Sequence, residues 1–196
     1  MATTPLERLL KRPSFTSKDA RALGIHPSRL AYYANQGTIE RVSRGLYRNP
    51  NIESTAPMEW QELLETAQSI PGGVICGVSA LRYYDLTQEM PRKHWIAVPN
   101  TVRAPKRPNA KIIRPRNLTL GREILKLGEY STFIFDRERS VLDAFKLLSR
   151  ESALRSLRAY LNPSNGPKPD FRKLVKYAKA LRVNVEQYLE AMQFDE

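Results

Sequence analysis

Residues 16–37 read TSKDARALGIHPSRLAYYANQG. Thr16 is followed three residues later by Asp19, which is the spacing of a capping box and predicts the start of a short helix. A glycine then supplies a tight turn, and Pro27 suits the first position of a second helix that we expect to end at Gly37. A helix, a turn and a helix at this spacing are typical of a helix-turn-helix.

The second of these helices, predicted over residues 27–36, separates apolar from polar side chains. Leu30, Tyr33 and Ala34 can face inward, which leaves a polar face for solvent or a partner. In a winged helix-turn-helix this helix lies in the major groove, where arginine and glutamine suit guanine and adenine edges. A serine at the helix N-terminus suits a phosphate. The predicted DNA contacts of the helix are Ser28, Arg29, Tyr32 and Gln36.

A hairpin is predicted directly after this helix. Two strand-prone runs, residues 38–43 and 46–48, flank Arg44 and Gly45. Such a wing contacts the flanking backbone or the minor groove, so its cationic side chains are candidates for DNA binding. The predicted contacts of the wing are Arg41, Arg44 and Arg48.

The rest of the chain predicts a second domain, residues 57–196, joined to residues 1–50 by a linker rich in proline, serine and asparagine. From residue 137 onward the apolar positions follow a helical period. We therefore expect an α+β protein: an N-terminal winged helix-turn-helix, then a C-terminal domain with a small sheet and a helical C-terminal half. The predicted strands of that sheet are residues 74–76, 94–98, 111–114 and 130–135.

The charge is large and uneven. The 32 basic and 20 acidic residues leave a formal net charge of +12. Residues 1–50 carry nine basic and three acidic groups, and residues 91–126 carry ten and one, whereas residues 51–90 carry one and six. Clustered positive charge indicates a polyanionic partner, although a solvated basic surface stays open as an alternative. In the second block, expected to be an extended loop and a strand edge, the candidate contacts with nucleic acid or a partner are Arg103, Lys106, Arg107, Lys111 and Arg114.

Composition and motifs argue against several other classes. With 41% apolar residues and no long apolar run, a membrane span is not expected, and the N-terminus has no signal-peptide pattern, so we predict a cytoplasmic protein.

The lone Cys76 reads as a buried thiol. No glycine-rich phosphate loop or paired metal ligands occur, so we predict no catalytic residues, no metal and no cofactor. Asp136 is explained as a helix N-cap and Glu138 as first-turn charge. The lysines among residues 172–179 are predicted to form a solvated face of their helix.

The chain resembles the AbiEi antitoxin family of bacterial abortive-infection, type IV toxin–antitoxin systems. In the N-terminal part the resemblance rests on residues 15–20, 23–25 and 37–48, the last ending Arg-Gly-Leu-Tyr-Arg. In the C-terminal part it rests on residues 74–81, 95–99 and 136–145. One departure is His26-Pro27 at the start of the second helix, where such proteins often have a small polar cap.

This resemblance implies two roles. The winged helix would bind double-stranded operator DNA with inverted repeats and repress its own operon, with DNA contacts at Arg29, Tyr32, Gln36 and Arg44. The C-terminal domain would counteract a nucleotidyltransferase-type toxin without forming a stable complex. We expect a monomer that pairs on symmetric DNA. A solitary winged-helix regulator, a structured-RNA-binding protein and an enzyme that reverses the toxin's modification are the alternatives.

Overall fold

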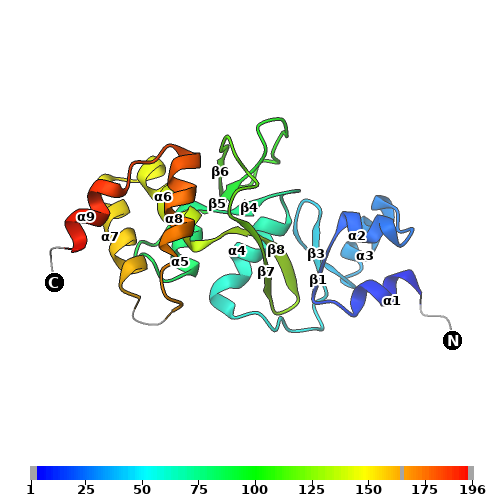
Figure 1. Cartoon of the computed structure of the whole chain (residues 1–196). Coiled ribbons are helices and arrows are strands. Elements are labelled where there is room, and N and C mark those ends of the chain that lie inside the picture. Colours follow the sequence, from blue (N-terminus) through cyan, green and yellow to red (C-terminus); the bar gives the residue numbers. More distant parts are fainter. Residues whose placement is uncertain (1–3, 164–165, 194–196) are drawn as a thin grey trace. The chain divides into compact units, whose positions relative to one another are not determined.

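The computed structural model describes residues 4–163 and 166–193. Helices and short strands occur in runs along the chain, and in the C-terminal part a run of strands precedes a run of helices, so the predicted α+β class is confirmed (Figure 1). The chain falls into two compact units. Unit 1 comprises the residues up to Pro71 together with Ile124–Thr132, and unit 2 comprises Gly72–Glu123 and the residues from Phe133 onward.

Helix α4 (Met58–Gln68) groups with unit 1. The sequence placed this helix at the start of the second domain. Compactness does not show which residues perform which role, so the functional domains 1–50 and 57–196 stay a prediction.

Three short helices open unit 1, and their limits follow from local chemistry. In α2 the predicted capping box is confirmed, because the Asp19 backbone N–H donates to Thr16 Oγ1 at 3.2 Å and the Thr16 backbone N–H donates to Asp19 Oδ2 at 2.8 Å. Helix α3 has Pro27 at its first position, as expected. The three helices are α1 (Pro5–Leu10), α2 (Ser17–Ala22) and α3 (Pro27–Asn35).

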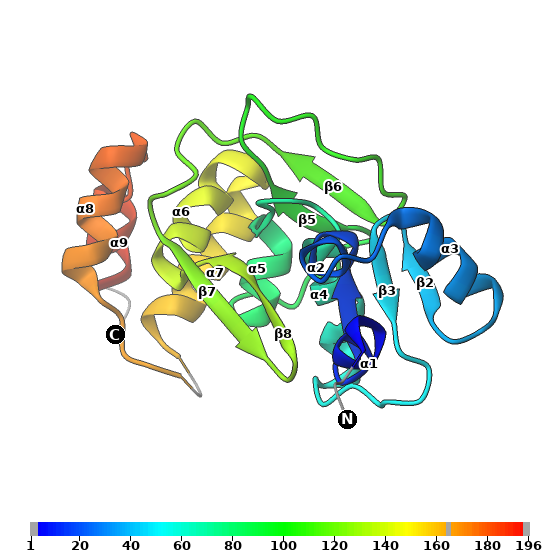
Figure 2. The same cartoon turned by 90° about the vertical axis from the view of Figure 1, so that its right-hand side faces the viewer.

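A three-stranded antiparallel sheet completes the winged helix, in the order β1-β3-β2. The predicted hairpin is confirmed as β2 (Glu40–Ser43) and β3 (Leu46–Arg48), with Gly45 at φ +86° in the turn (Figure 2). Strand β1 (Ser14–Thr16) was not predicted; it pairs with β3. The buried core of this winged helix consists of Leu9, Phe15, Ala20, Ile25, Leu30, Ile39 and Tyr47.

The second sheet has five strands in the order β6-β5-β4-β8-β7. Strand β4 pairs antiparallel with β5 and parallel with β8, and β5 pairs parallel with β6. The four strands predicted for this sheet are present, and β7 is an addition. The strands are β4 (Val74–Ile75), β5 (His94–Ala97), β6 (Ala110–Ile113), β7 (Arg122–Leu127) and β8 (Tyr130–Phe135).

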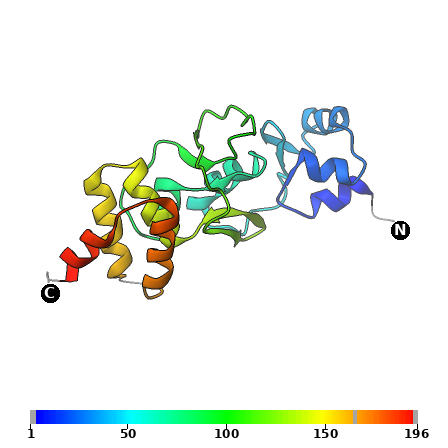
Figure 3. The same cartoon turned by 45° about the horizontal axis from the view of Figure 1, so that its top comes forward.

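The helical half of unit 2 packs around α6. Helix α6 contacts α5, α7 and α8 (Figure 3, α6 to α9 in yellow to red). The helical period that runs on past residue 148 is divided into two helices, because Ser149 caps a new one by accepting the Ser152 N–H at 3.1 Å. In the described part of the chain no helix is long and apolar enough to cross a membrane. The helices are α5 (Gly77–Tyr83), α6 (Arg137–Leu147), α7 (Arg150–Leu161), α8 (Phe171–Leu181) and α9 (Glu186–Gln193).

Candidate nucleic-acid interface

Helix α3 presents its polar face to solvent. Leu30 is fully buried, and Tyr33 and Ala34 pack against the core of the winged helix, so the predicted inward face is confirmed. On the other side Tyr32 is 59% exposed, and its ring meets that of Tyr33 edge-on at 5.7 Å between centroids. The outward face is therefore open to a partner, and all four of its predicted contacts, Ser28, Arg29, Tyr32 and Gln36, are exposed.

His26 is the N-cap residue of α3. Its Nδ1 accepts the Ser28 backbone N–H at 3.4 Å and lies 2.9 Å from Ser28 Oγ. An imidazole therefore does what a serine or aspartate cap does elsewhere. A phosphate at this N-terminus would compete with His26 for the Ser28 donors, whereas the Arg29 side chain, one residue further on, takes no part in the cap.

The wing places three arginines along one hairpin. Arg41 and Arg44 are exposed, and Arg44 precedes Gly45 at the tip. A register shift between Arg41 and Ser43 bends the strand next to this tip. Two of the predicted wing residues therefore lie where a nucleic-acid backbone could approach.

Residues 5–50 match a family model described as a transcriptional regulator, AbiEi antitoxin. The N-terminal part of this chain is therefore similar to the AbiEi antitoxin regulators, and we call residues 5–50 the AbiEi-type domain. The match ends at residue 50, so the resemblance of the C-terminal part to the same family stays a prediction. No curated protein matched the chain.

The third arginine of the wing is engaged inside unit 1. The Arg48 guanidinium donates a hydrogen bond to Glu65 Oε1 on α4 and lies 4.0 Å from Glu40. The Tyr130 hydroxyl donates to the same Glu65 oxygen at 3.2 Å. Burial lowers the pKa of Arg48, but the hydrogen bond and charge of Glu65 outweigh it and raise that pKa. Burial, followed by the charge of Glu65, raises the pKa of Tyr130 to about 12. Arg48 thus fastens the wing of the AbiEi-type domain to α4.

We expect Glu65→Ala to lower the free energy of unfolding, because it removes the contact between the wing and α4. It leaves the Arg48 guanidinium and the Tyr130 hydroxyl without their acceptor, which typically costs about 1–3 kcal/mol. Because 37% of the Arg48 side chain is exposed, water compensates part of this loss. Urea unfolding measures the change, and Glu59→Ala, at an exposed site of the same helix, is the control. Equal stabilities of the two variants would contradict the anchoring role.

The second basic block forms a loop and an edge strand, as predicted, since β6 is the first strand of its sheet. Arg103, Lys106 and Lys111 are exposed, and Lys111 Nζ lies 3.5 Å from the centroid of the Trp95 ring. Arg107 donates to the Lys106 carbonyl at 3.2 Å. Arg114 donates to the carbonyls of Pro99 and Val102 at 2.8 and 2.9 Å, so it closes the loop.

The carboxylates of α6 are paired internally. Asp136 accepts the Arg139 N–H at 2.8 Å, so its predicted role as N-cap is confirmed. Glu138 does more than complement the helix dipole: it is buried, accepts the Tyr160 hydroxyl at 2.9 Å and lies 2.8 Å from Lys173 Nζ. Lys173 also lies 3.1 Å from Asp136. The solvated face predicted for residues 172–179 is therefore wrong at Lys173, which joins two buried carboxylates.

Two further candidates for chemistry have structural roles. Ser79 Oγ accepts the Trp95 backbone N–H at 2.9 Å in a buried position. Cys76 is fully buried, as predicted, and burial raises the pKa of its thiol. Among residues 4–163 and 166–193 no group of histidine, cysteine, aspartate and glutamate side chains is arranged to hold a metal ion.

Proposed function

We propose that this protein binds operator DNA through α3 and the wing of its AbiEi-type domain and represses its own operon. The observation that supports it best is the exposed polar face of α3, which carries Arg29 and Gln36 on the second helix of a helix-turn-helix. Arginine and glutamine offer the paired donors that read guanine and adenine in the major groove. Inverted repeats would let two copies bind one site in equivalent ways.

In this proposal the wing supplies the part of the DNA binding that does not depend on base sequence. Arg44 at the tip and Arg41 on β2 are exposed cations that follow α3 in the sequence. Each contact that they make with a phosphate releases counterions from the DNA. Ser28 would contact a phosphate after displacing His26, and Tyr32 would pack against sugar or base. Arg48 contributes by holding the wing to Glu65.

We predict different losses for base-reading and phosphate-binding residues. Arg29→Ala or Gln36→Ala should cost about 1–3 kcal/mol of binding free energy and relax the preference at particular base pairs. Arg44→Ala should weaken binding to all sequences alike and lower the slope of log affinity against log salt by about one. Gel-shift titrations at several salt concentrations with the promoter of the chain's own operon measure both effects.

Lys168→Ala, which removes one exposed charge from unit 2, is the matched control. Unchanged affinity of the Arg29, Gln36 and Arg44 variants would refute the DNA interface. A duplex RNA that competes better than the operator would favour the structured-RNA alternative.

We further propose that residues 57–196 counteract a nucleotidyltransferase-type toxin without stable association. The support is the antitoxin description of the matched family together with the resemblance of the C-terminal part. An Arg29→Ala, Arg44→Ala double variant should lose repression yet still restore growth to cells that express such a toxin from the neighbouring gene. Loss of protection in a folded double variant would show that neutralisation needs the DNA interface.

A further inference from the structure

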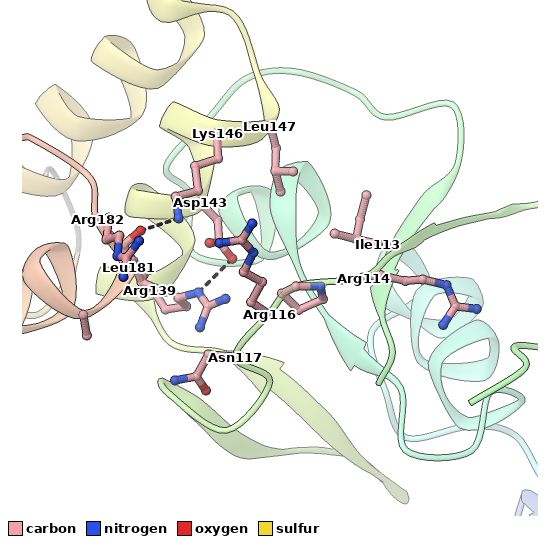
Figure 4. A pocket seen from close by; sticks show the side chains of 12 residues that line it. Ile113, Arg114, Arg116, Asn117, Arg139, Asp143, Lys146, Leu147, Leu181 and Arg182 are labelled. Atoms are coloured by element: carbon pink, nitrogen blue, oxygen red, sulfur yellow. Dashed lines mark hydrogen bonds and ion pairs between the residues drawn. The ribbon is translucent and has the colours of Figure 1, made fainter. Parts of the chain in front are cut away.

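Unit 2 contains a pocket of about 540 Å³ that the proposed function does not use. Three segments far apart in the sequence form its walls: residues 113–117 after β6, the inner face of α6, and residues 180–182 at the end of α8 (Figure 4). Its volume lies in the range of small-molecule sites.

The pocket carries an excess of positive charge. Arg116, Arg139, Lys146 and Arg182 line it, against the single carboxylate of Asp143. Arg114 also lines the pocket, but its guanidinium points away from the group in Figure 4 and closes the loop described above. These four cations come from three segments and meet at one volume. Such an arrangement suits a compact polyanionic ligand better than an extended nucleic-acid strand.

Several of these groups keep donors available. Arg139 uses Nε for Asp143 at 2.9 Å and Nη1 for the Leu120 carbonyl at 3.0 Å, and among the described residues no partner is bonded to its Nη2. The side chains of Arg116 and Arg182 likewise form no hydrogen bond or ion pair with the described part of the chain. Lys146 donates to the Leu181 carbonyl and so covers the negative end of α8, which would otherwise repel an anion.

Arg182 holds an unfavourable backbone conformation at the edge of this pocket. It ends α8 at φ +55° and ψ +49°, in the left-handed region that favours glycine. A residue with a Cβ is less stable in this conformation than glycine. An arginine held there at the expense of stability indicates a use for its guanidinium.

The pocket also has an apolar wall, formed by Ile113, Pro115, Leu147 and Ala180. This wall has no use for inorganic phosphate, whereas it suits an aromatic ring attached to a phosphate chain. We propose that the pocket binds a nucleoside triphosphate, with the phosphates on Arg116, Arg139 and Arg182 and the base against the apolar wall. This site lies outside the AbiEi-type domain and is independent of DNA binding.

Isothermal titration of the full chain with ATP in metal-free buffer tests the proposal. Arg182→Gly should weaken ATP binding about tenfold, since one charge-assisted hydrogen bond is lost. The same change should leave the unfolding midpoint unchanged or raise it, because glycine adopts the left-handed conformation freely. Arg116→Ser should weaken binding similarly. Lys176→Ala, an exposed charge on α8 outside the pocket, should change it less than about twofold.

Inorganic tripolyphosphate and adenosine separate the two halves of the ligand. Tripolyphosphate should bind more weakly than ATP, and adenosine should not bind measurably. Absence of heat at millimolar ATP would overturn the proposal, as would an equal loss in Lys176→Ala and Arg182→Gly. An Arg182→Gly variant that loses affinity for duplex DNA while it keeps ATP binding would assign the pocket to a polynucleotide and also overturn it.

Discussion

Gly77→Ala is expected to lower the free energy of unfolding by about 2–5 kcal/mol. Gly77 begins α5 at φ +53°, where a side chain costs about 1–2 kcal/mol. A Cβ there would lie 2.4 Å from Cε3 and 3.1 Å from Cζ3 of Trp95. The indole cannot easily move away. The Trp95 backbone is held on both sides, because its N–H donates to Ser79 Oγ and its carbonyl accepts the Cys76 N–H at 3.0 Å, and Lys111 covers the ring. Overpacking of this kind adds about 1–3 kcal/mol.

Gly72→Ala separates the two contributions. Gly72 also has a positive φ, +68°, but a Cβ added there would meet nothing within 4 Å, so only the backbone cost of about 1–2 kcal/mol is expected. Urea unfolding followed by circular dichroism compares the two variants. If Gly77→Ala were no less stable than Gly72→Ala, the close approach of the indole would not be a constraint on the fold.

The winged helix could be predicted from sequence because its determinants are local. The capping box at Thr16, the proline at position 27 and the glycine turn at position 45 act over a few residues, and each has one strong structural preference. The exposure of Arg29 and Gln36 followed from helical periodicity alone. That these side chains bind DNA stays a prediction, because exposure permits a contact without showing one.

Features that depend on distant residues could not be predicted in this way. Strand β7 has one buried side chain, Leu125, so its sequence lacks the alternation that marks a half-buried strand. The pairing of Arg48 with Glu65 crosses 17 positions, and that of Lys173 with Glu138 crosses 35. On α8 the helical period places Phe171 in one apolar stripe with Leu174, Ala178 and Leu181, yet Phe171 is 49% exposed whereas the other three are buried.

A second large loss of stability is expected when the ion pair of Arg139 and Asp143 is broken. The side chains are 1% and 8% exposed, and Arg139 Nε lies 2.9 Å from Asp143 Oδ2. Burial raises the pKa of Asp143, and the charge of Arg139 opposes this rise without cancelling it. Asp143→Ala removes the carboxylate and leaves a buried guanidinium with the Leu120 carbonyl as its remaining acceptor. We expect a loss of about 3–5 kcal/mol in the free energy of unfolding.

A matched pair elsewhere in the chain isolates the role of burial. Glu151 and Arg155 have the same four-residue spacing on α7 but are 73% and 77% exposed, so Glu151→Ala should cost no more than about 0.5 kcal/mol. Replacing both buried partners, as Arg139→Met with Asp143→Leu, should restore most of the stability, because neither charge is then left unpaired. If the double variant were as unstable as Asp143→Ala, the loss would come from packing around α6. A variant that regains stability while losing ATP binding would instead show that the buried guanidinium is retained for its ligand and not for the fold.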